Sequence, residues 1–144
     1  MARSGRPPKV DPLKPIHRAV MTGNVDDFSV ELASTDDNID LPGPEGMTPL
    51  HIAADRGNVE FAKALLEAGA MVDPINAFGN TPLWVAMMKR RRTCPDGSMI
   101  RLLIDHGADP NRGEGDVTPL GLTKRIAGLP EDLTVLLTAR AGEV

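Results

Sequence analysis

Residues 46–58 read GMTPLHIAADRGN, and this stretch decides the fold of the 144-residue chain. Its first five residues recur 33 positions further on as GNTPL at residues 79–83, and DVTPL at residues 116–120 follows after another 37 positions. A looser copy, KPIH at residues 14–17, lies 34 positions before TPLH of the first stretch. Self-similarity at this spacing is typical of a fold built from repeated supersecondary units. The sequence therefore predicts four repeats.

Each TPL triplet predicts the start of a helix. A threonine hydroxyl can accept a hydrogen bond from a free backbone amide of the first turn, and proline at the first helical position loses no needed hydrogen bond. The expected caps are Thr48, Thr81 and Thr118. In the second repeat the first helix should end at Gly57, because glycine readily adopts the left-handed conformation that closes helices.

A second helix is expected directly after Asn58, with its apolar residues on one face: Val59, Ala62, Leu65 and Leu66. A pair of such short helices cannot bury this face alone, so its stability must come from stacking on neighbouring repeats. The small residues Ala53 and Ala54 allow the helices to approach closely. The pattern predicts an all-α solenoid of stacked helix-turn-helix pairs with short turns or hairpins at the tips.

Residues 46–70 resemble the ankyrin-repeat signature, from GMTPLHIAADRGN to LLEAGA at residues 65–70, and residues 79–111 are similar to it. The resemblance implies repeats at approximately 14–45, 46–78, 79–114 and 115–140. These form one predicted domain over residues 14–144, preceded by a flexible, basic, proline-rich tail over residues 1–13.

The third and fourth repeats depart from this signature. Trp84 and Gly121 stand where the signature has histidine after Thr-Pro-Leu, which removes the side chain that would bond the turn. Thr81 and Gly107 are 26 positions apart, whereas Thr48 and Gly69 are 21 apart. We interpret the difference as a five-residue loop insertion within residues 91–97.

The ankyrin resemblance implies binding of another protein through a concave face, which consists of the turn tips and the exposed side of each first helix. Carried over position by position, that face includes Met21, Thr22, Pro44, Ala77, Glu114, Gly115 and Ile126. Its candidate partner-binding residues are Glu45, Met47, Asp55, Arg56, Phe78, Asn80, Met88, Lys89, Val117 and Arg125. Arg91 and Arg92 join them from the basic run at residues 89–92.

Two of these features have competing interpretations. Phe78, a large aromatic residue at a turn tip, is either an interface anchor or folds back onto the helix ends of the neighbouring repeat. The basic run either attracts an acidic partner or stabilises a helix C-terminus through the helix dipole. Trp84 is expected to pack between repeats.

Net charge and cysteine content give expectations about partner and compartment. The formal charge is −4; residues 1–14 carry four basic residues against Asp11, so the remaining 12 basic and 19 acidic residues give residues 15–144 a charge of −7. Such an acidic body favours basic protein partners and disfavours nucleic acid. No apolar run is long enough for a membrane span, and the only cysteine, Cys94, cannot form an internal disulfide. A cytoplasmic protein, monomeric when free, is expected.

Catalysis, cofactor binding and metal binding are not predicted. Cys94 has no histidine near it in sequence, and the three histidines are scattered. His17 and His51 are expected to bond the turns of their repeats, and His106 to cap a helix end.

The leading hypothesis is a non-enzymatic module that sequesters or inhibits a partner, including an immunity-type protein that neutralises a toxin. The alternative is a regulatory adaptor similar to the ankyrin kinase inhibitors. A DNA-associated factor that uses the tail and the basic run at residues 89–92 is the weakest interpretation; Gly-Arg-Pro at residues 5–7 of the tail faintly resembles an AT-hook.

Overall fold

The computed structural model describes residues 13–34, 39–93, 95–113, 118–126 and 128–142. These residues form α-helices and one short 3-10 helix, and they contain no β-strand. In chain order the elements are α1 (Pro15–Thr22), α2 (Val25–Ala33), η1 (Pro44–Gly46), α3 (Pro49–Arg56), α4 (Val59–Glu67), α5 (Pro82–Thr93), α6 (Ser98–Asp105), α7 (Pro119–Leu122) and α8 (Glu131–Ala141). The predicted tail over residues 1–13 lies outside this description except for Leu13.

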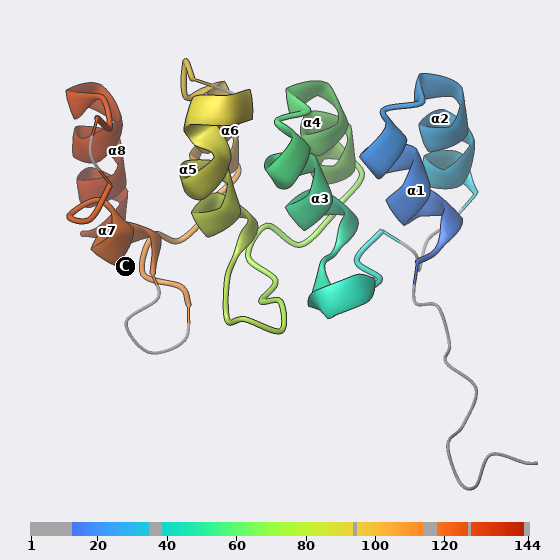
Figure 1. The fold of residues 1–144 in the computed structure, drawn as a ribbon, viewed down its shortest axis with the longest axis horizontal. Helices are drawn as coiled ribbons and strands as arrows, with labels where there is room; N and C mark the ends of the chain where they lie inside the picture. Colours follow the sequence, from blue (N-terminus) through green and yellow to red (C-terminus); the bar gives the residue numbers. More distant parts are fainter. Residues whose placement is uncertain (1–12, 35–38, 94, 114–117, 127, 143–144) are drawn as a thin grey trace, which may run out of the picture.

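The helices stand side by side as four consecutive pairs, which confirms the predicted all-α solenoid (Figure 1). We call α1, α3, α5 and α7 the inner layer, and α2, α4, α6 and α8 the outer layer. Within the inner layer α3 packs against both α1 and α5, and α5 also packs against α7. In the outer layer α6 packs against α4 and α8. The turns between repeats project together beyond one end of the helices.

Side-chain caps start the helices where the sequence predicted them. The hydroxyl oxygens of Thr48, Thr81 and Thr118 each accept a hydrogen bond from the amide three residues further on, at 3.3, 3.3 and 3.0 Å. Asn24 and Asn58 cap α2 and α4 in the same way, each at 3.0 Å. Local chemistry therefore sets the beginning of these five helices, whereas α1, α6 and α8 begin without a side-chain cap.

One apolar core runs through all four repeats. Ile16, Leu50 and Leu83 occupy equivalent inner-layer positions and are completely buried. Ala53 and Ala54 are also buried, as expected for small residues at the closest approach of two helices. Each pair therefore buries its apolar face partly against the next pair, which is the stacking that the short helices require.

The third repeat differs from the prediction, because residues 91–93 of its inserted segment are helical rather than a loop. In the second repeat Gly57 has φ +71° and ends α3. The equivalent position in the third repeat is Arg90, and α5 continues through it to Thr93. Without a glycine to close the helix, α5 adds about one turn. Gly97, with φ +77°, then precedes α6.

Buried histidines hold the turns of the first two repeats, and His51 also ties the second repeat to the third. The backbone amides of Lys14 and Thr48 donate to Nδ1 of His17 and His51, at 2.9 and 3.2 Å. Because Nδ1 accepts, the proton of the neutral ring is on Nε2, which donates to the carbonyl of Leu41 at 2.6 Å or Asn80 at 2.9 Å. The structural role predicted for both imidazoles is confirmed.

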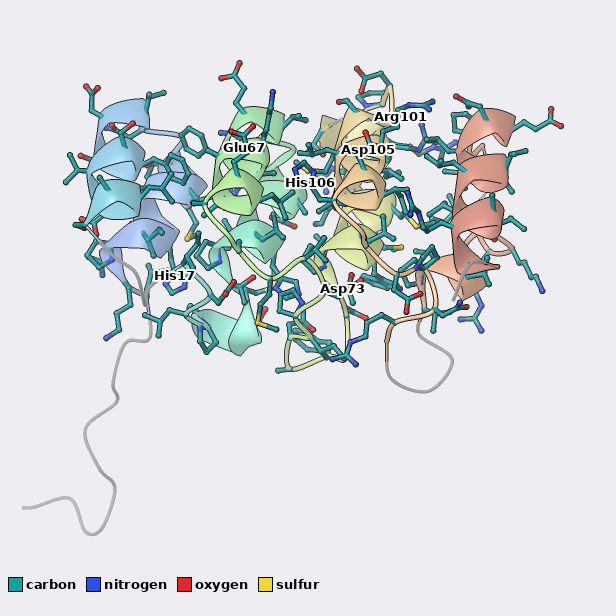
Figure 2. All side chains as sticks on the ribbon, turned by 180° about the vertical axis from the view of Figure 1, so that it is seen from behind. His17, Glu67, Asp73, Arg101, Asp105 and His106 are labelled. Atoms are coloured by element: carbon teal, nitrogen blue, oxygen red, sulfur yellow. The ribbon has the colours of Figure 1, made fainter. Side chains whose placement is uncertain are left out.

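Carboxylates at the turns provide a second set of ties between repeats. The amide of Met71 donates to Oδ1 of Asp40, and the amide of Asp109 donates to Oδ2 of Asp73, both at 2.9 Å. Burial raises the pKa of Asp73, which lies on the turn side of the stack (Figure 2). The other oxygen of Asp73 is buried without a partner in the described part of the chain.

Acidification is expected to destabilise the stack through the two buried histidines. Burial lowers the pKa of His17 and His51 below the ordinary value of 6.5. The unfolded chain therefore binds protons more tightly than the folded one. The contribution of the two histidines to the free energy of unfolding is fully present above pH 6.5, and it is lost as the pH drops toward their lowered pKa values in the folded state. Urea unfolding at a series of pH values measures this slope. His51→Gln should flatten the profile, whereas the control His106→Gln, at an exposed helix end, should keep it.

Gly57→Ala is expected to destabilise the protein more than Gly23→Ala. The two glycines end α3 and α1 with φ of +71° and +76°, so both variants bear the same left-handed strain of about 1–2 kcal/mol. A Cβ at position 57 would also lie 2.5 Å from Cβ of Thr93, whereas a Cβ at position 23 meets nothing within 4 Å. Urea unfolding of both variants measures the difference; equal losses would show that the extra turn of α5 does not press on the end of α3.

Candidate binding surface

The inner layer and its turns form two adjoining grooves. The apolar groove, of about 170 Å³, is lined by Leu13, Met21, Pro44, Glu45, Met47, Ile52, Asp55 and Arg56. The basic groove, of about 390 Å³, is lined by Asp55, Arg56, Lys89, Arg92 and Thr93. Because Asp55 and Arg56 line both, the grooves meet at the end of α3.

Elements of the first two repeats build the apolar groove. Met21 comes from the last turn of α1, and Ile52 from α3. Met47 stands between η1 and α3, and its sulfur accepts a hydrogen bond from Nδ2 of Asn76 at 3.3 Å. Glu45 has φ +60°, and its carbonyl accepts from the amide of Ala77 in the next repeat at 2.9 Å. Hydrogen bonds from Asn76 and Ala77 therefore fix Met47 and Glu45 in the wall of the groove.

The extra turn of α5 builds the basic groove. It carries Arg92 and Thr93 beyond the point at which α3 ends. Nζ of Lys89 lies 3.4 Å from Oδ1 of Asp55, which links α5 to α3 across the groove. Within the described residues, neither Arg56 nor Arg92 has a hydrogen-bond or ion-pair partner. The groove therefore contains three cationic side chains and one carboxylate.

Charge is divided between the two layers of helices. In the inner layer α1 carries +1, α3 and α7 carry no net charge and α5 carries +4, which gives +5. In the outer layer α2 carries −3, α4 and α8 carry −1 each and α6 carries none, which gives −5. Figure 2 labels two of these outer acids, Glu67 on α4 and Asp105 on α6. The two layers cancel, so the charge of −7 over residues 15–144 comes from the turns and loops. The inner helices favour an acidic partner, and the basic partner expected from total charge stays a prediction for the acidic turns.

Six of the predicted partner-binding residues line the two grooves: Glu45, Met47, Asp55, Arg56, Lys89 and Arg92. Sequence reasoning missed Leu13, Ile52 and Thr93. The replacement of the helix-ending glycine by Arg90 was the signal that could have placed Thr93 beside α3.

Phe78 and Asn80 share a turn but differ in exposure. Phe78 is 61% exposed, so the alternative that its ring folds back onto the neighbouring repeat is wrong. Asn80 is only 8% exposed, because it lies inside the turn where its carbonyl accepts the hydrogen bond from His51. We therefore exclude the Asn80 side chain from the candidate surface. Trp84 is partly buried and packs against the core.

The remaining predicted residues lie around the grooves. Met88 on α5 is 48% exposed, and Arg91 and Arg125 are exposed. Val117 lies outside the described residues. Phe78 and Met71 are the large apolar side chains exposed between α4 and α5, and Met88 is the one exposed on α5 itself.

The basic run at residues 89–92 is not one exposed patch, because Arg90 is buried. Its Nη1 donates to the carbonyl of Pro95 and its Nη2 to the carbonyl of Gly128, both at 2.8 Å. Arg90 thus connects α5 to the turn that follows it and to the fourth repeat. In the third repeat this tie takes the place of the histidine, since Trp84 occupies the equivalent position.

Stacked helix pairs with projecting turns and a grooved inner layer define a solenoid repeat protein of the protein-interaction class. The family model described as ankyrin repeats, in three copies, matches residues 16–114. This match covers more than half of the chain, which therefore belongs to the ankyrin-repeat family.

Curated relatives include both bacterial and mammalian proteins. An ankyrin repeat protein of Rickettsia bellii is 36% identical over 100 residues, which cover 64% of this chain and 39% of that protein. Cyclin-dependent kinase 4 inhibitor B of Bos taurus is 44% identical over 71 residues, or 49% and 50% of the two chains. Cyclin-dependent kinase inhibitor 2A of Homo sapiens is 38% identical over 97 residues, or 64% and 56%. The chain thus spans less than two thirds of each of these relatives.

None of the helices in the described part of the chain has both the length and the apolarity needed to cross a membrane.

Arg90→Ala is expected to lower the free energy of unfolding by about 2–3 kcal/mol, because it leaves two carbonyls without their charged donor. Arg91→Ala, a truncation of the exposed neighbour, is the matched control and should change it by less than about 0.5 kcal/mol. Urea unfolding measures both variants. Equal stabilities would contradict the assigned role of Arg90 as the link to the fourth repeat.

Proposed function

We propose that this protein binds another protein through the concave face formed by the inner layer and its turns, and that it inhibits or sequesters that partner by covering part of its surface. The observation that carries the proposal is the pair of adjoining grooves on this face, with Phe78 exposed at a neighbouring turn tip. Folding gains nothing from an aromatic ring in water, whereas an interface gains from burying it.

The composition of the surface supports protein binding. Met21, Met47 and Met88 are at least partly exposed, and methionine side chains adapt to irregular apolar partners. Charged side chains surround them and would form the polar rim of an interface. Most residues of this surface lie in helices or in turns that are hydrogen-bonded to one another. The loss of conformational entropy on partner binding would therefore be small.

The inhibitory part of the proposal is supported by two of the relatives, which are named as cyclin-dependent kinase inhibitors. A regulatory protein of this inhibitor type is therefore favoured. A toxin-neutralising role with a basic partner was suggested by the acidic total charge. The inner and outer helices cancel in charge, so this acidity comes from the turns and loops. Such a role would require binding through acidic turns or through the outer helices.

We include in the proposal that the protein has no catalytic activity of its own, acts in the cytoplasm and is monomeric when free. Its two most buried histidines already hold backbone groups on both ring nitrogens, so neither is available as a general base. A single cysteine suits a reducing compartment.

Phe78→Ala is expected to weaken partner binding by about 2 kcal/mol, roughly 30-fold, because the ring would be an anchor of the interface. The partner is first captured from the source cells with the full chain as bait and then purified. Calorimetry measures its affinity for the two variants, and titration of the partner's activity with this protein measures inhibition.

Val135→Ala is the matched control, since Val135 on α8 is 59% exposed but lies in the outer layer. Its affinity should stay within about twofold of the original. A partner that tolerates Phe78→Ala but responds to Val135→Ala would place the interface on the outer layer and overturn the proposal.

A further inference from the structure

We propose that the two grooves bind one acidic segment of the partner protein, with an apolar side chain in the apolar groove and carboxylates in the basic groove. This inference rests on the proposed function and specifies the chemistry of the partner, which that proposal leaves open.

The cations of the basic groove are available for an incoming anion. Arg56 and Arg92 have no partner within the described residues, and Lys89 shares the single carboxylate of Asp55 at 3.4 Å. Three positive groups against one negative group leave the groove with a charge of +2. A guanidinium group can donate two parallel hydrogen bonds to a carboxylate, so an acidic side chain fits this groove in both charge and geometry.

The negative ends of two helix dipoles favour basic side chains at this groove, but their charge is too small to neutralise those side chains. Both α3 and α5 end at the basic groove, and the partial negative charge of a helix C-terminus attracts basic side chains. That charge amounts to only about half an elementary charge per helix. Two helix ends therefore offset about one of the two excess positive charges, and the groove still attracts anions.

Thr93 packs directly against Gly57, since a Cβ added at position 57 would lie only 2.5 Å from Cβ of Thr93. The extra turn of α5 therefore closes over the end of α3 and forms one side of the groove with Arg92 facing the same space as Arg56. The anion site depends on the longer helix, which distinguishes the α3–α5 junction from the α1–α3 junction.

The adjoining apolar groove determines which apolar side chain of the partner segment would bind beside its carboxylates. Met21, Met47 and Ile52 supply flexible or branched apolar surface that suits a leucine, isoleucine or methionine side chain. Because the grooves share Asp55 and Arg56, an apolar residue and an acidic residue can come from one continuous stretch of the partner. The predicted ligand is a segment with an apolar anchor followed or preceded closely by acidic residues.

A nucleic acid fits this surface less well than a protein segment. Glu45 and Asp55 flank the apolar groove and would repel a phosphate backbone. Binding of single strands usually relies on several stacking aromatics, whereas Phe78 is the one large exposed aromatic side chain in the described part of the chain. The outer layer, with its charge of −5, offers no second track for phosphates.

Selection of displayed random peptides on the full chain tests the proposal without knowledge of the partner. The enriched peptides should be acidic and contain a leucine, isoleucine or methionine near the acidic residues. One selected peptide is then synthesised, and its affinity is measured by fluorescence anisotropy. A version with glutamine and asparagine in place of its acidic residues should bind about tenfold more weakly.

Arg92→Glu should weaken binding of the selected acidic peptide by about tenfold or more, because it converts an attractive charge into a repulsive one. Lys63→Glu is the matched charge reversal on the outer layer, where the lysine is 63% exposed, and should have less than about a twofold effect. Thermal unfolding checks that both variants stay folded, and Arg92→Gln replaces Arg92→Glu if the reversal impairs folding.

Selection of neutral or basic peptides, or no enrichment at all, would overturn the inference. Equal effects of the two charge reversals would also overturn it, as would tighter binding of a single-stranded DNA oligonucleotide than of the acidic peptide. Neutral or basic peptides whose affinity still falls with Phe78→Ala would leave the proposed function intact. Enriched peptides that respond to no inner-layer variant would overturn both proposals.

Discussion

Every feature of this molecule depends on the inability of a short helix pair to bury its own apolar face. Helices of eight or nine residues, such as α3 and α4, are too short to be stable in isolation. They persist because Leu50, Leu83 and their neighbours form one core that continues from repeat to repeat. Buried His51 and the turn carboxylates of Asp40 and Asp73 then set the alignment, since each joins a side chain of one repeat to the backbone of the next. The same stacking aligns the inner helices and therefore creates the grooves between them.

A single change in the repeat pattern couples the fold to the candidate site. The glycine that ends α3 has Arg90 as its counterpart, and α5 consequently continues for about one more turn. This turn carries Arg92 into the basic groove while the Arg90 side chain bonds to the fourth repeat. The fourth repeat has a first helix of only four residues, so an additional polar tie at this junction is consistent with its short apolar contact surface.

The net charge of a repeat protein is a poor guide to its interface. Basic residues in α5 and acidic residues in α2 are far apart in sequence, and the total charge does not reveal them, because the −7 of residues 15–144 comes from the turns and loops. Antiparallel pairing places first and second helices in different layers, so the charges separate into +5 and −5 rather than mixing. A protein partner that approaches the inner layer experiences the positive charge at short range, because salt screens charges on the far layer at physiological ionic strength.

Local chemistry let the sequence alone determine the helix starts at the Thr-Pro-Leu triplets, the helix end at Gly57 and the solenoid class, because caps and glycine closures act within a few residues. Five groove residues could also be assigned from their repeat positions, and Arg92 from the basic run. Only the tertiary structure decided that Phe78 is exposed and Asn80 buried within one turn, that the inserted residues extend α5, and that Arg90 is an internal tie rather than a surface charge. These outcomes depend on which groups of a neighbouring repeat occupy the space beside each side chain, and that information is not present in any single repeat.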